Sequence, residues 1–154
     1  MNRIAVAEPT SEAFAPFGEV GARHADGGQA PAPVHVALDL SSGTPRFYIM
    51  RFAQRGLVFE VVAGRDRVTR SLGAVDGAPW LMAVAPANIA QPGLADIRAF
   101  CIPPECFIKL GLGTWHAGPY FTEPVRDFYN LEMVDTNTAD YTVWRLNAPT
   151  EFAT

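Results

Sequence analysis

The chain has little of what nucleic-acid-binding or disulfide-stabilised proteins require. Its 154 residues include 12 lysines and arginines against 16 acidic residues, which gives a net charge of −4. No basic excess is available to neutralise phosphates, so we expect no nucleic-acid partner. The two cysteines, Cys101 and Cys106, are too few for a disulfide scaffold and their spacing fits no zinc pattern. We interpret them as buried thiols.

Long apolar runs are also lacking. No stretch approaches the roughly 20 apolar residues that span a bilayer, and the N-terminal MNRIAVAEPT has no signal-peptide core. We therefore expect a cytoplasmic protein with no membrane partner. The length is enough to bury one substantial core, which predicts a single domain over residues 1–154.

Potential metal ligands are scarce. Of the three histidines, His24 and His35 fall in the irregular segment 23–35, which we predict to be a loop. A metal site needs ligands grouped on adjacent strands, so we predict no cofactor, with a metal-dependent protein as the alternative. The glycines of 111–113 lack the lysine and the helix of a phosphate-binding loop.

Turn residues and short alternating segments are abundant. Thirteen glycines and thirteen prolines separate segments rich in β-branched and aromatic residues. This pattern predicts an all-β barrel or sandwich with one short helix over Ser11–Phe17, capped by Ser11, and a frayed tail at 147–154. The expected strands are 46–52, 57–62, 68–72, 80–85, 97–101, 106–110 and 127–134.

The segment FIKLGLGTWHAGP at 107–119 carries a lysine and a histidine in apolar surroundings. Strand alternation puts Lys109 and Phe107 on one face. If that face is internal, Lys109 needs a partner or ligand; if it is external, Lys109 is an ordinary surface residue. His116 follows two glycines, and a side-chain pKa of ~6.5 suits proton transfer, although a structural histidine is the alternative.

The segment DFYNLEM at 127–133 predicts a strand with a polar inner face. Asn130 and Glu132 alternate with Tyr129 and Leu131. If both faces are covered, Asn130 and Glu132 point into a polar pocket, and otherwise the strand is half exposed.

Arginines form a third group of candidates. Arg70 shares a strand face with Val68 and Leu72, and a guanidinium placed there suits binding of a carboxylate. An ion pair with Glu60, Asp66 or Glu132 is the alternative. Arg46 precedes the FYIM strand that contains Tyr48.

Five blocks of the sequence resemble the ureidoglycolate lyase family, and the plant-type branch most of all. They are FAPFGEV (14–20), PRFYIMR (45–51), VTRSLGAVDGAPWLMAVAP (68–86), FIKLGLGTWHAGP (107–119) and DFYNLEMVDTN (127–137). The resemblance implies a cupin-like double-stranded β-helix, or jelly-roll, barrel. It also implies cleavage of (S)-ureidoglycolate to glyoxylate and urea in purine catabolism, through allantoin degradation, by a homodimer.

The resemblance assigns two residues and shows departures at others. His116 matches the histidine of the family's Trp-His motif, and Glu132 matches an acidic position in the late strand. Arg65 stands where family members carry a histidine, and Arg70 where they carry glutamine. The plant-type members support Lys109 at its position, whereas the bacterial members carry another residue there.

Together these observations predict an acid/base site for elimination of urea. The predicted catalytic residues are His116, Glu132 and Lys109. In the expected reaction a base takes the carbinol proton and an acid protonates the departing nitrogen. The predicted substrate-binding residues are Arg70, Tyr48, Asn130 and Arg46. A cupin enzyme for another small carboxylic acid and a non-catalytic metabolite-binding cupin are the alternatives.

Overall fold

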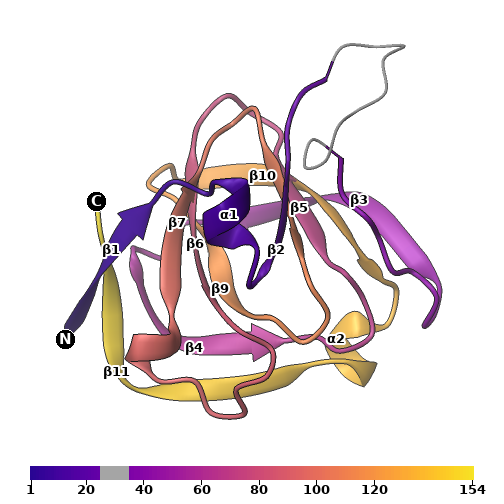
Figure 1. The fold of residues 1–154 in the computed structure, drawn as a ribbon. Coiled ribbons are helices and arrows are strands. Elements are labelled where there is room, and N and C mark those ends of the chain that lie inside the picture. Colours follow the sequence, from indigo (N-terminus) through magenta and orange to yellow (C-terminus); the bar gives the residue numbers. More distant parts are fainter. Residues whose placement is uncertain (25–34) are drawn as a thin grey trace.

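A computed structural model describes residues 1–24 and 35–154, and Figure 1 shows its strands and short helices. The strands are β1 (Asn2–Ala7), β2 (Gly18–Gly21), β3 (Pro45–Ala53), β4 (Val58–Gly64), β5 (Ser71–Ala74), β6 (Trp80–Ala85), β7 (Arg98–Ile102), β8 (Phe107–Leu110), β9 (Trp115–Tyr120), β10 (Val125–Met133) and β11 (Thr142–Ala153). The helical segments are α1 (Ser11–Phe14), the 3-10 turn η1 (Leu94–Asp96) and α2 (Thr136–Ala139).

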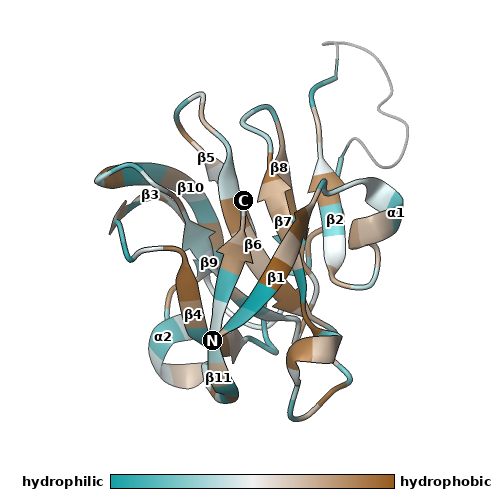
Figure 2. Ribbon diagram, turned by 90° about the vertical axis from the view of Figure 1, so that its left-hand side faces the viewer, coloured by the Kyte–Doolittle hydropathy of each residue, from teal (hydrophilic) through white to brown (hydrophobic). Residues whose placement is uncertain are grey.

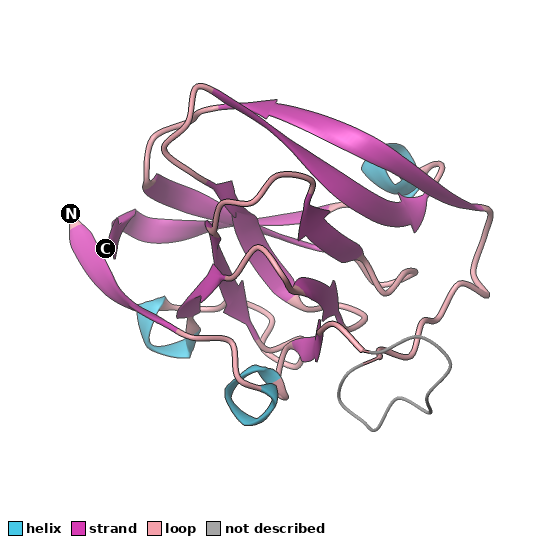
Figure 3. Cartoon of the chain, turned by 90° about the horizontal axis from the view of Figure 1, so that it is seen from above, coloured by secondary structure: helices cyan, strands magenta, loops and turns pink. Residues whose placement is uncertain are grey.

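The strands form a closed barrel and a second sheet. The barrel has the order β1-β11-β4-β9-β6-β7, and the second sheet has the order β2-β8-β5-β10-β3. Seen from above in Figure 3, the helices are short and lie at the edges of the strand layers. The expected all-β barrel is confirmed.

Two hydrophobic cores follow from strand alternation. The barrel core contains Trp115 and Ala117, whereas Val84 and Phe128 belong to a second cluster, the inter-sheet core, between the barrel and the sheet. His116 is paired with Val84 in the register of β9 and β6, so its side chain lies on the inter-sheet side. Figure 2 shows the hydrophobic colouring along β4 and β8 that accompanies this burial.

The inter-sheet space changes from apolar to polar along its length. On β10 the inward residues run from Phe128 to Asn130 and Glu132, all three almost completely buried. The same change occurs beside β5, where Leu72 is followed towards the N-terminus by Arg70. The polar end of this space is where a site can form, because buried polar groups need partners there.

Several sequence predictions required correction. Strands β1, β2, β9 and β11 were not predicted, and residues 147–154 are part of β11 rather than a frayed tail, because β11 pairs with both β1 and β4. The expected helix ends at Phe14, and Thr10 rather than Ser11 caps it by accepting a hydrogen bond from the Ala13 amide. Of the loop predicted at 23–35, residues 25–34 lie outside the described residues.

Within the described ranges, none of the helices has the length and apolar character that crossing a bilayer requires.

Candidate active site

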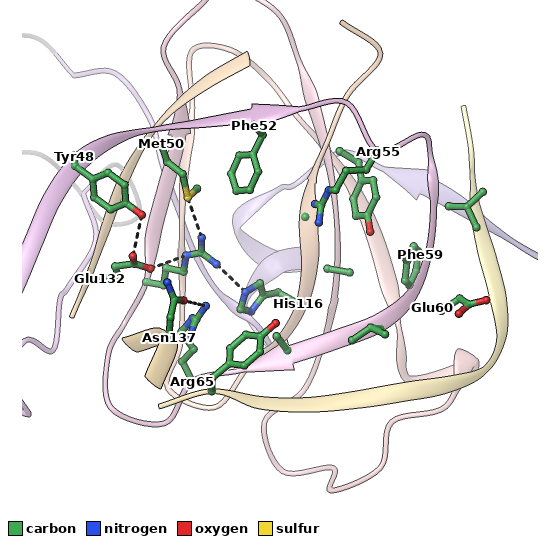
Figure 4. A pocket seen from close by; sticks show the side chains of 18 residues that line it. Tyr48, Met50, Phe52, Arg55, Phe59, Glu60, Arg65, His116, Glu132 and Asn137 are labelled. Atoms are coloured by element: carbon green, nitrogen blue, oxygen red, sulfur yellow. Dashed lines mark hydrogen bonds and ion pairs between the residues drawn. The ribbon is translucent and has the colours of Figure 1, made fainter. Parts of the chain in front are cut away.

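A cavity of about 590 Å³ opens at the polar end of the inter-sheet space, as Figure 4 shows. Its volume lies within the roughly 300–1,000 Å³ typical of small-molecule sites. Strands β3, β4, β9 and β10 and the segment around α2 contribute its walls. The lining residues used below are Tyr48, Met50, Phe52, Arg55, Phe59, Glu60, Arg65, Arg70, His116, Tyr120, Glu132, Asn137 and Tyr141.

Arg70 is the central cation of the cavity. Its Nε donates to Asn130 Oδ1 at 3.0 Å, and its Nη1 donates to His116 Nε2 at 2.9 Å. Its Nη2 lies 3.7 Å from the sulfur of Met50, a weak acceptor. Burial lowers the pKa of Arg70 to about 10, so the guanidinium stays charged at neutral pH. The cation is therefore fixed in place with donor capacity left for a ligand.

His116 is neutral and has a defined tautomer. Because a guanidinium can only donate, His116 Nε2 accepts from Arg70 and the ring proton is on Nδ1. Burial, together with the positive charges of Arg70 and Arg65, lowers the pKa of His116 to about 3. The imidazole is thus an uncharged acceptor held against a cation.

Glu132 is the ionised carboxylate of the site. It accepts hydrogen bonds from Arg46 Nη2 at 2.5 Å and from the Tyr48 hydroxyl at 3.0 Å, and its second oxygen lies 3.8 Å from Arg70 Nε. Burial acts to raise the pKa of Glu132, but the hydrogen bond from Arg46 and the charge of Arg70 outweigh it, so the pKa is lowered. Glu132 therefore anchors Arg46, Tyr48 and Arg70 around one charge.

Arg65 is a site residue that the sequence predictions did not include. It lies directly after β4 and donates to the Thr136 carbonyl at 3.0 Å and to Asn137 Oδ1 at 3.1 Å. Its guanidinium also stacks 4.8 Å from the ring centroid of Tyr141. In the sequence Arg65 belongs to the charged run GRDR, which is typical of an exposed turn, so no local signal marks it as buried.

The structure brings six of the seven predicted residues into one connected network. His116 and Asn130 contact Arg70, and Arg70, Arg46 and Tyr48 surround Glu132. Among the proposed ion-pair partners of Arg70, the structure selects Glu132. Arg46 joins this network through Glu132 and through the ring of Tyr48, whose centroid lies 4.6 Å from its guanidinium, and it is not part of the cavity wall.

Lys109 does not join this network. On β8, Ile108 and Leu110 pack into the inter-sheet core, so Lys109 faces the opposite side of the sheet and forms an ion pair with Glu19 of β2. This placement corrects the expectation that Lys109 and His116 share a pocket.

Donors dominate the unsatisfied groups beside the cavity. Among the buried side-chain atoms without a hydrogen-bond partner in the described ranges, three are nitrogens of residues in or next to the cavity wall, namely Arg65 Nε, His116 Nδ1 and Asn130 Nδ2. Unpaired buried donors are costly, and an acceptor-rich ligand such as a carboxylate or a ureido carbonyl would satisfy them. Across residues 1–24 and 35–154, no cluster of three or more histidine, cysteine or acidic side chains is arranged to hold a metal ion.

The fold and site define a cupin-like barrel protein with a cation-lined pocket suited to a small acid. The chain belongs to the ureidoglycolate lyase family, because the family model described as ureidoglycolate lyase matches residues 1–151. Membership in this family supports, in general terms, a lyase activity towards ureidoglycolate. A search of curated proteins gave no match to the sequence.

Proposed function

We propose that the chain, as one cupin-like domain, cleaves (S)-ureidoglycolate to glyoxylate and urea in allantoin degradation, by general acid/base elimination at the cavity around Arg70. Family membership supports the reaction. The single observation that carries the site is the contact of 2.9 Å between Arg70 Nη1 and His116 Nε2, which puts a carboxylate-binding cation beside a proton acceptor.

In this proposal Arg70 binds the substrate carboxylate, with the charge of Arg65 nearby. Guanidinium groups bind carboxylates through two parallel hydrogen bonds, and the interaction is strong in a partly dehydrated cavity. The hydrogen bond to Asn130 and the charge of Glu132 hold Arg70 in place before the substrate arrives. Little reorganisation is then needed at the moment of reaction.

His116 acts as the proton carrier. When the substrate carboxylate takes up Arg70 Nη1, the lone pair of His116 Nε2 is released from its hydrogen bond with Arg70. Nε2 then takes the carbinol proton, the C–N bond breaks as the C=O bond of glyoxylate forms, and the proton passes to the departing urea nitrogen. The bound carboxylate offsets the charges of Arg70 and Arg65, which are two of the causes that lower the pKa of His116. Substrate binding thereby makes the imidazole a better base.

The other residues of the network position the reacting groups. Glu132 holds Arg70 and is itself fixed by Arg46, which makes Arg46 a positioning residue. The hydroxyl of Tyr48 and the unpaired Nδ2 of Asn130 supply neutral hydrogen bonds to the ureido group.

The test is release of glyoxylate and urea from racemic ureidoglycolate. We expect His116→Gln to lower kcat by about 10²–10⁴-fold, the usual contribution of a positioned acid/base group. Lys109→Met is the matched control, since Lys109 lies outside the cavity, and it should keep kcat within about twofold. Absence of urea release by the native protein, or a native rate in His116→Gln, would contradict the proposal.

A second candidate function is action on another small carboxylic acid. The observation that favours it is the cavity volume of about 590 Å³, which exceeds what a substrate of fewer than a dozen non-hydrogen atoms needs. A panel of 2-hydroxy and ureido acids assayed for turnover distinguishes the two candidates. Stabilisation by glyoxylate with no turnover of any acid would instead indicate a non-catalytic binding protein.

A further inference from the structure

The cavity carries more positive charge than one carboxylate can balance. Its walls include three arginines, Arg55, Arg65 and Arg70, against two glutamates, Glu60 and Glu132. Each glutamate already has an arginine partner outside the walls, because Glu132 pairs with Arg46 and Glu60 pairs with Arg145. In a chain whose net charge is −4, this local excess favours a ligand with more than one negative charge.

Arg55 is the cation that the proposed reaction does not use. It follows β3, and Figure 4 shows it with Phe59 at the end of the cavity away from Tyr48 and Glu132. Its Nη2 donates to the Pro119 carbonyl at 3.0 Å, and its guanidinium lies 4.5 Å from the ring centroid of Tyr120.

Arg55 is held in position yet lacks a counter-ion. Within residues 1–24 and 35–154 it forms no ion pair, and the nearby Glu60 is already paired with Arg145. A stacked and hydrogen-bonded guanidinium keeps the remaining N–H donors free for a ligand. The aromatic end of the cavity is therefore a second place where an anion can bind.

The two cations lie beside successive inward-facing residues of β3. Arg70 contacts Met50, and Arg55 lies 5.6 Å from the ring centroid of Phe52, two residues further along β3. Two residues of a strand span about 7 Å, and both side chains face the cavity. An acid with carboxylates at both ends of a chain of a few methylenes covers this span.

We propose that the cavity binds dicarboxylates of four to six carbons, with one carboxylate at Arg70 and the second at Arg55. The rings of Phe52 and Tyr120 pack against the methylenes between them. This inference rests on the proposed function in using Arg70 as the first anchor. For the proposed lyase, a ureido acid with a second carboxylate is then a better-bound ligand than ureidoglycolate.

Calorimetric titration of the full chain with paired acids tests the second anchor. Glutarate is compared with pentanoate, and adipate with hexanoate, so that each pair differs only in the second carboxylate. We expect the dicarboxylate of a pair to bind about tenfold more tightly, the effect of one charge-assisted contact. Arg55→Gln should remove this advantage and leave binding of the monocarboxylates unchanged.

Arg98→Gln is the matched control. Arg55 and Arg98 are both exposed and both donate to backbone carbonyls, Arg98 to those of Ala95 and Ile97, but Arg98 lies outside the cavity. It should keep the full dicarboxylate advantage.

Three outcomes would overturn the inference: equal binding within each pair, an advantage that survives Arg55→Gln, or no binding of either series by the native protein. A dicarboxylate advantage without urea release would remove the lyase proposal and leave this one standing. Urea release without a dicarboxylate advantage would remove this inference and leave the lyase proposal standing.

Discussion

At the residue scale, the chemistry of His116 is set by what surrounds it. The imidazole is buried, faces Arg70 across 2.9 Å, and has Arg65 nearby, so its charged form is disfavoured. A histidine with the usual pKa of ~6.5 would be partly charged near neutrality. Neutral His116 and ionised Glu132 therefore coexist in one site, joined through the guanidinium of Arg70.

The burial of neutral His116 predicts a pH dependence of stability. Its folded pKa of about 3 lies below the unfolded value of ~6.5, so between these values the unfolded chain binds more protons. The contribution of His116 to the free energy of unfolding is complete above pH ~6.5. It is lost as the pH falls towards 3, with a slope of up to ~1.4 kcal/mol per pH unit. Urea unfolding between pH 7 and 4 measures it.

The variant His116→Gln should lose this part of the slope. His24→Gln is the control, because His24 is exposed, and its slope should match that of the native protein. Equal slopes in all three proteins would mean that folding does not lower the pKa of His116.

Substitution of Arg70 by lysine tests the guanidinium fork. Lysine keeps the charge but has no planar pair of donors. It therefore cannot hydrogen-bond to Asn130 and His116 and also bind a carboxylate through two hydrogen bonds. We expect Arg70→Lys to raise KM for the carboxylate substrate at least about tenfold. Steady-state kinetics measures this, and an unchanged KM would place carboxylate binding elsewhere.

At the element scale, α2 and the residues around it are attached to the cavity by few but specific contacts. Arg65 donates to backbone carbonyls of Thr136 and Asp140. In return the Asp140 carboxylate accepts from the amides of Asp66 at 2.8 Å and Arg67 at 2.9 Å. This reciprocal pair positions Asn137 and Tyr141, which line the cavity.

We therefore expect Asp140→Ala to loosen the segment around α2. Loss of the carboxylate leaves two amide donors unpaired, at a cost of about 1–3 kcal/mol in the free energy of unfolding. Hydrogen exchange should show reduced protection over residues 134–141. Asp135→Ala is the control, because the Asp135 side chain is half exposed and, within the described residues, its carboxylate makes a single contact, a 3.6 Å ion pair with Arg67. Equal effects of the two variants would show that the Asp140 contacts do not hold the segment.

At the scale of the whole molecule, β1 closes the barrel, and the outer face of β3 and β10 carries exposed apolar side chains. The strand β1 pairs in parallel with both β11 and β7. On the outer face of β3 and β10, Phe47, Ile49 and Tyr129 are 69%, 55% and 44% exposed. The rings of Phe47 and Tyr129 are stacked 5.9 Å apart. Contiguous exposed apolar side chains are typical of an association surface.

We propose that this face forms the contact of a homodimer, the state that the family resemblance implied. Phe47→Asp should shift the protein from dimer to monomer at micromolar concentration, because a charge would be buried in the contact. Light scattering coupled to size exclusion measures the mass. The control is Val143→Asp, which should leave the mass unchanged because Val143 is an exposed apolar residue of β11, on the barrel. A native protein that elutes as a monomer would contradict the proposed dimer.

Strand alternation in the sequence determined which residues share a face. It grouped Asn130 with Glu132, Arg70 with Leu72, and Lys109 with Phe107, and the structure keeps these groupings. The strand predicted at 68–72 begins only at Ser71, so Arg70 lies directly before β5 and not in it. Together with the glycines and prolines, the same pattern indicated the all-β barrel, and the family motifs supplied its cupin-like type.

Only the tertiary structure decided which of those faces is internal. Arg70, directly before β5, and Lys109, on β8, are both single charges in apolar segments, yet Arg70 points into the cavity while Lys109 points away from it. The period of a strand is two, so exchanging its inner and outer faces changes no local preference. The choice is made by pairing between distant segments, which places Leu72 opposite Ile108 in the core and Ser71 opposite Lys109 outside. Burial of Arg65 depends in the same way on partners about 70 residues later in the chain, which no local pattern contains.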